Sequence, residues 1–379
     1  MKKIGITCYP TVGGSGIIAT ELGMKLAEVG HEVHFITSKM PFRLNKLYPK
    51  IFYHEVEITN YPVFQSPPYD LALAAKMAEV VEREKLDILH VHYAIPHAMS
   101  AILARDLAEH DVKVITTLHG TDISVLGHDP AFKRILHYGI EQSDAVTAVS
   151  HSLAKETKER IGIEKDISVI YNFVNEDVYF RKNLASIKEQ FSIDPDEKIV
   201  MHISNFRKVK RIPDVIHTFK YIREKVKAKL LLVGDGPEAS TAFSLVKELN
   251  LENDVLFLGK KRKISDLLSI ADLMLLLSEH ESFGLVLLEA MSCEVPAIGT
   301  NVGGIPEVIQ HDETGYIVEL GEVKQAAEYA TKLLTDDGLL KKFSKNALAY
   351  ARERFHSKKI VKQYTDLYDK LLRKPVKVE

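Results

Sequence analysis

The chain has 379 residues, of which 46% are hydrophobic and 27% charged, and its formal net charge is −2. This length predicts about two domains with sizeable cores, and the charge gives no general reason to expect a nucleic-acid partner. The first apolar run stops at Pro10 and no other approaches the roughly 20 residues of a membrane span, so we expect neither a signal peptide nor a membrane helix, and a cytoplasmic location.

A first predicted strand, Ile4–Cys8, leads into the loop Gly13-Gly14-Ser15-Gly16 and a helix over Ile17–Val29. The loop lies where a dinucleotide-binding loop would lie. Its spacing is not Gly-x-Gly-x-x-Gly, however, and no acidic residue ends the next strand, Glu32–Thr37. Dinucleotide binding is therefore disfavoured, and the loop is either a tight turn or a substrate contact.

Helical and strand patterns alternate through the rest of the first half. The predicted elements are a helix at Leu71–Glu84, a strand at Ile88–His92, a helix at Met99–Ala108, a strand at Val112–Leu118, a helix at Phe132–Gln142, a strand at Ala145–Val149, a helix at Leu153–Arg160 and a strand at Ile167–Tyr171. This order predicts right-handed crossovers and a parallel sheet with helices on both faces. Ligands of such sheets bind outside the carboxyl ends of the strands.

Polar residues gather at the predicted strand ends. They include Ser15, Tyr93, Thr117, His119 and Asn172. Each alone is more typical of a helix cap or a turn, but their convergence on one edge of the sheet favours a ligand site. Because His119 is followed by Gly120, its ring can project from the strand end and donate a hydrogen bond.

No metal site is predicted. His90 and His92 share one face of their strand with no third ligand evident beside them, so we interpret them as core or edge histidines. Cys8 and Cys293 lack the spacing of zinc ligands and are not expected to form a disulfide. Asp194-Pro195-Asp196 is interpreted as turn chemistry.

A second alternating series begins at Ile199, after the charged segment Asn183–Lys198, which has the character of a domain boundary. Its predicted strands are Ile199–Ile203, Lys229–Val233, Val255–Leu258, Leu273–Leu277 and Ala297–Gly299. We expect domains at 1–172 and 173–358, with a cleft between facing strand ends. Within 359–379, a helix at Ile360–Leu372 could pack back on the first domain.

The stretch from Glu281 to Gly304 carries the strongest functional signal. Leu285–Met291 is rich in helix formers and follows a strand, so Glu281–Gly284 is predicted as a strand-to-helix turn. The N–H groups of a first helical turn have no intrahelical partners, and Gly284 allows close approach, which together make a socket for phosphate.

Glu281 and Glu289 flank this turn. In one continuous helix they would be about 12 Å apart along the axis. A retaining glycosidase holds its two carboxylates about 5–5.5 Å apart, so a nucleophile-and-acid pair is disfavoured. A ligand with hydroxyls at two places and a diphosphate between them, such as a sugar nucleotide, fits this spacing better.

The segment Ser204–Arg211 follows the first strand of the second half and holds four cations in five residues. Such a run is either a solvated patch or a set of charges that neutralise a diphosphate leaving group. We select Lys210 and Arg207 as ligand contacts. The glycines of the turn Gly234-Asp235-Gly236-Pro237 are interpreted as structural.

Taken in order, these motifs resemble the retaining GT-B glycosyltransferases, a family that includes sucrose-synthase-like and mannosyl transferases. The motifs are Gly13-Gly14, His119-Gly120, Lys210, Val233-Gly234-Asp235-Gly236-Pro237, Glu281 with Glu289, and Val302-Gly303-Gly304-Ile305-Pro306-Glu307. The resemblance covers nearly the whole chain. It implies two Rossmann-like doubly wound α/β domains facing a cleft, transfer of a sugar from UDP with retention of anomeric configuration, no cofactor and no metal.

The same resemblance implies roles for individual residues. The catalytic set is His119, Glu281, Lys210 and Arg207; the donor-binding set is Gly14, Gly16, Asn205, Gly284, Leu285 and Glu289; the acceptor-binding set is Ser15, Tyr93, Thr117 and Asn172. Within these sets, Glu281 would contact the hydroxyls of the donor sugar and Glu289 the ribose. A Gly-Arg pair is usual in the family where this chain has Ser204-Asn205, which leaves open whether Arg207 supplies the missing cation.

Three further segments resemble the branch of this family that glycosylates L-malate in bacillithiol synthesis: His90-Val91-His92-Tyr93, Tyr171-Asn172-Phe173 and Ser204–Arg211. This resemblance implies UDP-N-acetylglucosamine as donor and L-malate as acceptor, with neither nucleic acid nor membrane as partner and a homo-oligomer left open. The alternatives are a transferase with a lipid or sugar acceptor, a UDP-sugar epimerase on the same fold, and a noncatalytic sugar-nucleotide sensor.

Overall fold

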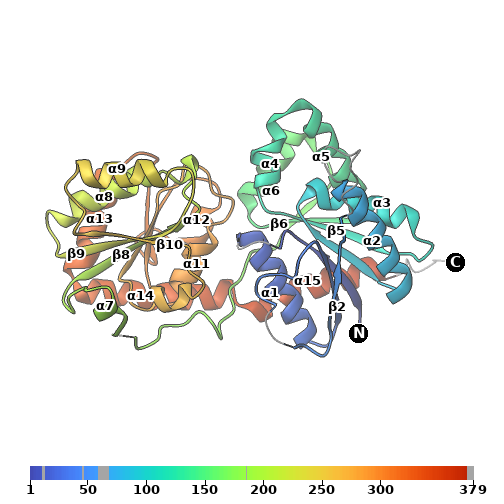
Figure 1. Cartoon of the computed structure of the whole chain (residues 1–379), viewed down its shortest axis with the longest axis horizontal. Coiled ribbons are helices and arrows are strands. Elements are labelled where there is room, and N and C mark those ends of the chain that lie inside the picture. Colours follow the sequence, from blue (N-terminus) through green and yellow to red (C-terminus); the bar gives the residue numbers. More distant parts are fainter. Residues whose placement is uncertain (11–12, 45–46, 59–67, 185, 374–379) are drawn as a thin grey trace. The chain divides into compact units, whose positions relative to one another are not determined.

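Figure 1 shows the computed structural model of the chain, which forms two compact α/β units. The first consists of Met1–Asn172 together with Ser357–Glu379, and the second of Phe173–His356. The structure describes residues 1–10, 13–44, 47–58, 68–184 and 186–373.

The first unit is built on a parallel sheet. In sheet order its strands are β3 (Ile51–Glu55), β2 (Glu32–Thr37), β1 (Lys3–Thr7), β4 (Ile88–His92), β5 (Lys113–Leu118), β6 (Ala145–Ala148) and β7 (Ile167–Val169). Its helices are α1 (Gly14–Glu28), α2 (Tyr69–Glu84), α3 (Met99–Leu107), α4 (Thr121–Ser124), α5 (Pro130–Gln142), α6 (His151–Thr157) and α15 (Ser357–Leu372). All five residues of the inner strand β4 are buried, as expected of a strand covered on both faces.

Helix α15 completes the core of the first unit although it lies at the far end of the sequence. The hydroxyl of Tyr368 is 2.7 Å from Nδ1 of His90 on β4, and both side chains are buried. Lys2 and Asp369 form an ion pair at 2.7 Å. The C-terminal helix therefore covers the centre of the first sheet, a docking site that its periodicity alone could not give.

The second unit repeats the architecture. In sheet order its strands are β10 (Val255–Gly259), β9 (Ala228–Gly234), β8 (Lys198–Ser204), β11 (Leu273–Leu276), β12 (Ala297–Thr300) and β13 (Gly315–Val318). Its helices are α7 (Ser186–Gln190), α8 (Ile212–Arg223), α9 (Ala239–Glu248), α10 (Ile264–Leu268), α11 (Leu285–Ser292), α12 (Ile305–Val308), α13 (Val323–Thr335) and α14 (Asp337–Arg354). The apolar strands β8, β9 and β11 lie at the centre of its core.

The sequence prediction and the structure differ at two strands and one segment. Strands β3 and β13 were not predicted. The charged segment Asn183–Lys198 lies inside the second unit, and the chain passes between units at Asn172. Lys227, which immediately precedes β9, binds Asp194 at 2.8 Å and Asp196 at 3.2 Å, so the turn carboxylates of this segment are neutralised within the second unit.

Both sheets reverse their strand order at one point, between β1 and β4 in the first unit and between β8 and β11 in the second. Loops diverge at such a switch point and leave a crevice outside the strand ends, where doubly wound sheets bind ligands. A ligand site is therefore expected among the residues that follow these four strands. Among the described residues, no helix has the length and apolar character needed to cross a membrane.

Candidate active site

At the switch point of the second unit, the loops that follow β8 and β11 are joined to each other. The Glu279 N–H donates to the carbonyl of Val209 at 2.8 Å. Nζ of Lys210 lies 2.5 Å from Oε2 of Glu281, and each side chain is 17% exposed. The structure thus brings together two residues that are predicted independently, from two different strand ends.

The turn that carries Glu281 rests directly on a pair of glycines. Gly304 donates its N–H to the carbonyl of Glu281 at 2.8 Å. A Cβ at Gly303, whose φ is +53°, would lie 1.9 Å from that same carbonyl oxygen, and a Cβ at Gly304 would lie 2.3 Å from the carbonyl oxygen of Ser282. No side chain fits at either position, which explains the Gly-Gly pair in the Val302–Glu307 motif.

Gly284 ends the turn and caps helix α11. Its backbone is left-handed, with φ 87° and ψ 52°, a conformation that glycine adopts readily. The first N–H groups of α11, beginning at Leu285, have no earlier helical carbonyl to bind, so this end of the helix favours an anion. Glu289 lies one turn further along α11 and is buried, with 5% of its surface exposed.

The cations after β8 fall into two groups. Arg211 has a left-handed backbone and binds Asp214 through two contacts, of 2.6 and 3.2 Å, so its charge is already compensated. Arg207 is exposed and forms no ion pair within the described part of the chain. Lys208 is likewise exposed and forms no ion pair among the described residues, so a ligand role for Arg207 and Lys210 stays a prediction.

Gly234 and Gly236 have the structural role that the sequence suggested. A Cβ at Gly234 would lie 1.8 Å from the carbonyl oxygen of Ser204, and one at Gly236 would lie 2.0 Å from that of Asn205. The two loops can pack backbone to backbone only because both residues are glycines. This contact leaves the side chain of Asn205 exposed at the same strand end as Arg207.

At the switch point of the first unit, aromatic rings from neighbouring strand ends lie against one another. Tyr9 follows β1, Tyr93 follows β4 and His119 follows β5. The Tyr93 ring centroid is 5.5 Å from that of Tyr9 and 5.4 Å from that of His119. Tyr93 has φ +86°, a strained backbone for a bulky residue that the surrounding structure must hold in place.

The ring of His119 is positioned by contacts with a second histidine, His92. Its Nε2 lies 2.8 Å from Nδ1 of His92, and the two rings stack with centroids 5.1 Å apart. His97 bonds through Nδ1 to the carbonyl of His92, and the rings of His90 and His92 stack with centroids 4.7 Å apart. The orientation of His119, and the nitrogen that carries its proton, are therefore set by His92.

These imidazoles are neutral at physiological pH. Loss of hydration lowers the pKa of His119 and of His90 to about 3 and that of His97 to about 4, and it holds the pKa of His92 well below its usual range. Neighbouring histidines add to the effect on His119, His90 and His92. His119 therefore offers a hydrogen bond to a ligand without a positive charge.

Asp122 fixes the backbone that presents His119. Its carboxylate is buried and accepts hydrogen bonds from the N–H groups of Gly120 and Ala94, each at 3.0 Å. Burial raises the pKa of this carboxyl, and the two backbone bonds oppose that shift. Asp122 thus ties the loop after β5 to the loop after β4.

One predicted site residue lies in the core instead. Thr117 is fully buried, and its hydroxyl bonds to Nε2 of His90 and to the hydroxyl of Thr147, each at 2.7 Å. Both faces of a parallel sheet are covered, so a strand residue before the last position points into the interior whichever face it occupies. Thr117 thus has its hydrogen-bond partners inside the core, and its assignment to the acceptor set stays a prediction.

The other predicted residues of the first unit lie at strand or helix ends. Gly14 and Ser15 begin helix α1, where Gly14 is exposed, Ser15 is partly exposed and Gly16 is buried. Asn172 follows β7 and is buried, with 7% of its surface exposed. Gly13 is the N-cap of α1, and no side chain caps this helix within the described part of the chain.

Sequence reasoning missed Tyr9 and the supporting roles of His92 and Asp122. Tyr9 precedes a proline and carries no motif, so only the strand order could reveal its place beside Tyr93. The alternation of His90 and His92 does indicate a shared face, but not that His92 reaches across to the next strand end.

Comparison with known proteins places these features in a family. Residues 12–178 match the family described as Glycosyltransferase Family 4, and residues 185–350 match Glycosyl transferases group 1. N-acetyl-alpha-D-glucosaminyl L-malate synthase of Bacillus anthracis is 59% identical over 371 residues, which cover 98% of this chain and 97% of that protein. The chain belongs to the GT-B glycosyltransferases.

Three further similarities involve proteins that share less of their sequence with this glycosyltransferase. The phosphatidylinositol N-acetylglucosaminyltransferase GPI3 subunit of Saccharomyces cerevisiae is 27% identical over 356 residues, covering 87% of this chain and 75% of that protein. Among solved structures, HepE of Anabaena in complex with UDP and glucose matches with a TM-score of 0.83 at 21% identity, covering 97% of this chain and all (100%) of that one. Sucrose-phosphate synthase of Thermosynechococcus elongatus matches with a TM-score of 0.81 at 22% identity, covering 98% and 99%. These structural matches share the fold.

Proposed function

We propose that this glycosyltransferase moves N-acetylglucosamine from UDP-N-acetylglucosamine to the hydroxyl of L-malate, the first step of bacillithiol synthesis. The observation that carries the proposal is the 59% identity, over 98% of the chain, to an enzyme named for that product. The residues of the two switch points support it, since they supply the groups that a nucleotide sugar and a hydroxy acid require.

The second unit binds the donor in this proposal. The N–H groups of Gly284, which caps α11, and of Leu285, which begins it, hold the diphosphate, and Arg207 and Lys210 neutralise its charge. Glu281 uses one carboxylate oxygen for Lys210, and its other oxygen, which has no hydrogen-bond partner among the described residues, accepts from a sugar hydroxyl. Glu289 binds the ribose further along the helix, and Asn205 contributes at the neighbouring strand end.

The first unit binds the acceptor and the sugar. The neutral ring of His119 bonds to the donor sugar, oriented by His92. Ser15, Tyr93 and Asn172 surround the malate. Gly14 and Gly16 add the N-terminus of α1, whose partial positive charge suits an anionic group of either substrate.

The reaction exchanges one bond for another at the anomeric carbon. The malate hydroxyl oxygen bonds to that carbon, and the bond from the carbon to the β-phosphate oxygen breaks. UDP leaves with the electron pair, and the hydroxyl proton passes to its phosphate. Attack on the face that UDP leaves retains the α configuration. Lys210 and Arg207 stabilise the charge that develops on the leaving diphosphate.

The test incubates the purified chain with UDP-N-acetylglucosamine and a panel of acceptors: L-malate, D-malate, L-lactate, glycerate, phosphatidylinositol vesicles, or none. UDP release is measured, and the product is characterised by proton NMR. We expect release that depends on L-malate and a product with the α anomeric coupling.

The other outcomes discriminate the alternatives. Release with phosphatidylinositol and none with L-malate would replace the acceptor while keeping the transferase. Conversion of the donor sugar without any acceptor would identify an epimerase. UDP binding with no turnover on any substrate, unchanged in Glu281→Ala, would identify a sensor.

A further inference from the structure

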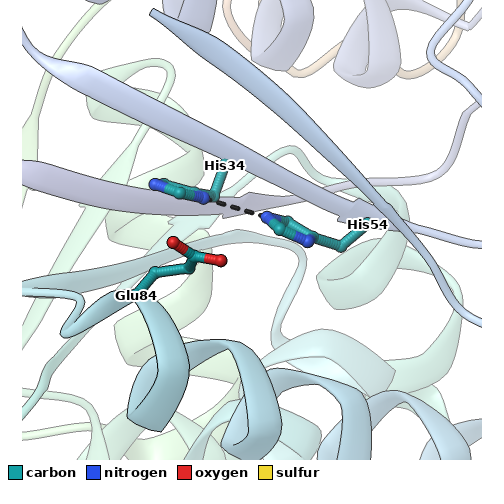
Figure 2. A group of neighbouring side chains, drawn as sticks. All are labelled: His34, His54 and Glu84. Carbon is teal, nitrogen blue, oxygen red and sulfur yellow. Dashed lines mark hydrogen bonds between the residues drawn. The ribbon is translucent and has the colours of Figure 1, made fainter.

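A second group of chemically active side chains lies in the first unit, away from the strand ends described above. His34 on β2, His54 on β3 and Glu84 at the end of α2 face one another (Figure 2). One nitrogen from each histidine and one oxygen of the carboxylate all lie within 4.8 Å of one another. Nothing in the transfer reaction uses these three residues.

His34 has the surroundings of a metal ligand. Its side chain is 1% exposed, and Phe52 stacks on its ring with centroids 4.9 Å apart. Its Nε2 lies 3.1 Å from a carboxylate oxygen of Glu32, which Lys3 holds at 3.0 Å. A carboxylate behind one imidazole nitrogen fixes the ring and leaves the other nitrogen for a metal, which is the usual outer-shell arrangement of metal-binding histidines.

Nδ1 of His34 points at Nε2 of His54, 2.9 Å away, and the two rings lie nearly parallel at an angle of 12°. Two zinc–nitrogen bonds of about 2.0–2.1 Å at a tetrahedral angle place their nitrogens about 3.3 Å apart. Metal binding therefore requires the two nitrogens to separate by a few tenths of an ångström and the rings to tilt, so that both lone pairs point at the ion.

Arg83 opposes metal binding at this position. Its Nη2 lies 3.0 Å from Nδ1 of His54, and its Nε lies 2.8 Å from Glu84. A guanidinium only donates, so Nδ1 of His54 accepts and the ring proton sits on Nε2, facing His34. Metal binding at Nε2 of His54 requires that proton to move to Nδ1, the atom that accepts the hydrogen bond from Arg83. The Arg83 side chain is 50% exposed and has room to turn away.

We propose that His34 Nδ1, His54 Nε2 and the Glu84 carboxylate form a binding site for a divalent transition-metal ion of the zinc class. Two imidazoles and one carboxylate are a common zinc ligand set, completed by water. The ion fastens the edge strand β3 to β2 and to the end of α2. This proposal does not depend on the identity of the sugar or of its acceptor.

The test uses the full chain, freed of metal with a chelator, and measures Zn²⁺ binding by competition with a chromophoric chelator. Co²⁺ absorption reports the coordination geometry. We expect one equivalent of Zn²⁺ and the intense visible bands of a four-coordinate Co²⁺ site. His54→Gln and Glu84→Gln should each raise the Zn²⁺ Kd by more than about 100-fold, beyond the cost of losing an outer-shell partner.

Two further variants separate this site from weak surface binding. Glu79→Gln removes an exposed carboxylate from the same helix that also contacts Arg83, and should leave the Kd close to that of the unaltered chain. Arg83→Gln removes the competing donor and should tighten binding roughly two- to fivefold, as expected for an exposed ionic contact. Absence of a bound equivalent in the unaltered chain, or equal affinity in His54→Gln, overturns the proposal.

Discussion

Lys210 and Glu281 are joined at 2.5 Å although 71 positions separate them in the sequence. The contact exists because the chain reverses its strand order between β8 and β11, which places the loops after these strands side by side. In the proposed reaction the pair stays formed: it holds Lys210 where it can face a diphosphate, while the second carboxylate oxygen of Glu281 accepts from a sugar hydroxyl.

Lys210→Ala should lower kcat by about 10²–10³-fold, the usual effect of removing one group that stabilises developing charge. Lys208→Ala is the matched control, because Lys208 is exposed on the same loop and has no ion pair within the described residues. Steady-state UDP release measures both. Equal rates for the two variants would remove Lys210 from the reaction.

Gly303→Ala should weaken UDP binding, because the new Cβ would lie 1.9 Å from the Glu281 carbonyl oxygen and force the turn away. Gly321→Ala provides the comparison. Its φ is also positive, at +86°, but no heavy atom lies within 4 Å of the added Cβ, so it reports the left-handed backbone cost alone, about 1–2 kcal/mol. Calorimetric titration with UDP distinguishes the two. Similar affinities would contradict the supporting role of Gly303.

Tyr368→Phe should destabilise the first unit by about 1–3 kcal/mol, because it leaves Nδ1 of the buried His90 without its partner. Tyr364→Phe should cost less, since the Tyr364 hydroxyl lies at 3.5 Å from that of Thr117, the limit of a hydrogen bond. Urea denaturation followed by circular dichroism compares the variants. The reverse order of stabilities would be inconsistent with the docking contact described here.

Stability should fall in mild acid because of the buried histidines. The pKa values of His90, His97 and His119 are lowered to about 3, 4 and 3, whereas the unfolded side chains titrate near pH 6.5. Below about pH 6.5 the unfolded chain binds protons that the folded chain does not, so the free energy of unfolding falls by at most about 1.4 kcal/mol per pH unit for each histidine. Above that pH their contribution is constant.

Denaturation at a series of pH values between 4 and 8 measures this slope. His97→Gln should reduce it, whereas substitution of the exposed His137 by Gln should leave it unchanged. A slope that is identical in all three proteins would show that the buried histidines do not control the acid response.

The sequence predicts most of this architecture because its strands are buried on both faces and read as apolar runs between helical patterns. Strand β3, Ile51–Glu55, is an exception, since it lies at the edge of its sheet and each of its residues is only partly buried or exposed. Strand β13, Gly315–Val318, is mostly buried and carries the apolar run Tyr316–Val318, so its sequence does contain a strand signal, which the prediction did not use.

The residues of the candidate site also differ in how far the sequence predicts them. Gly284 and Glu281 are readable from sequence because a strand-to-helix turn that binds phosphate demands a flexible residue at that point. The burial of Thr117 was not readable, since its hydroxyl is satisfied by His90 and Thr147, which lie on the two neighbouring strands. Contacts of this kind depend on which strands are neighbours, and that order becomes visible only in the folded sheet.

The placement of α15 has a consequence for how the protein is made. Because Ser357–Glu379 belongs to the first unit, the second unit is complete on the ribosome before the first has received its last helix. At a synthesis rate of about 5–20 residues per second, roughly ten to forty seconds pass between synthesis of the first sheet and synthesis of the tyrosines of α15 that cover His90. The second unit is therefore free to fold first. During that interval the amino-terminal sheet still lacks α15 and is a substrate for chaperones.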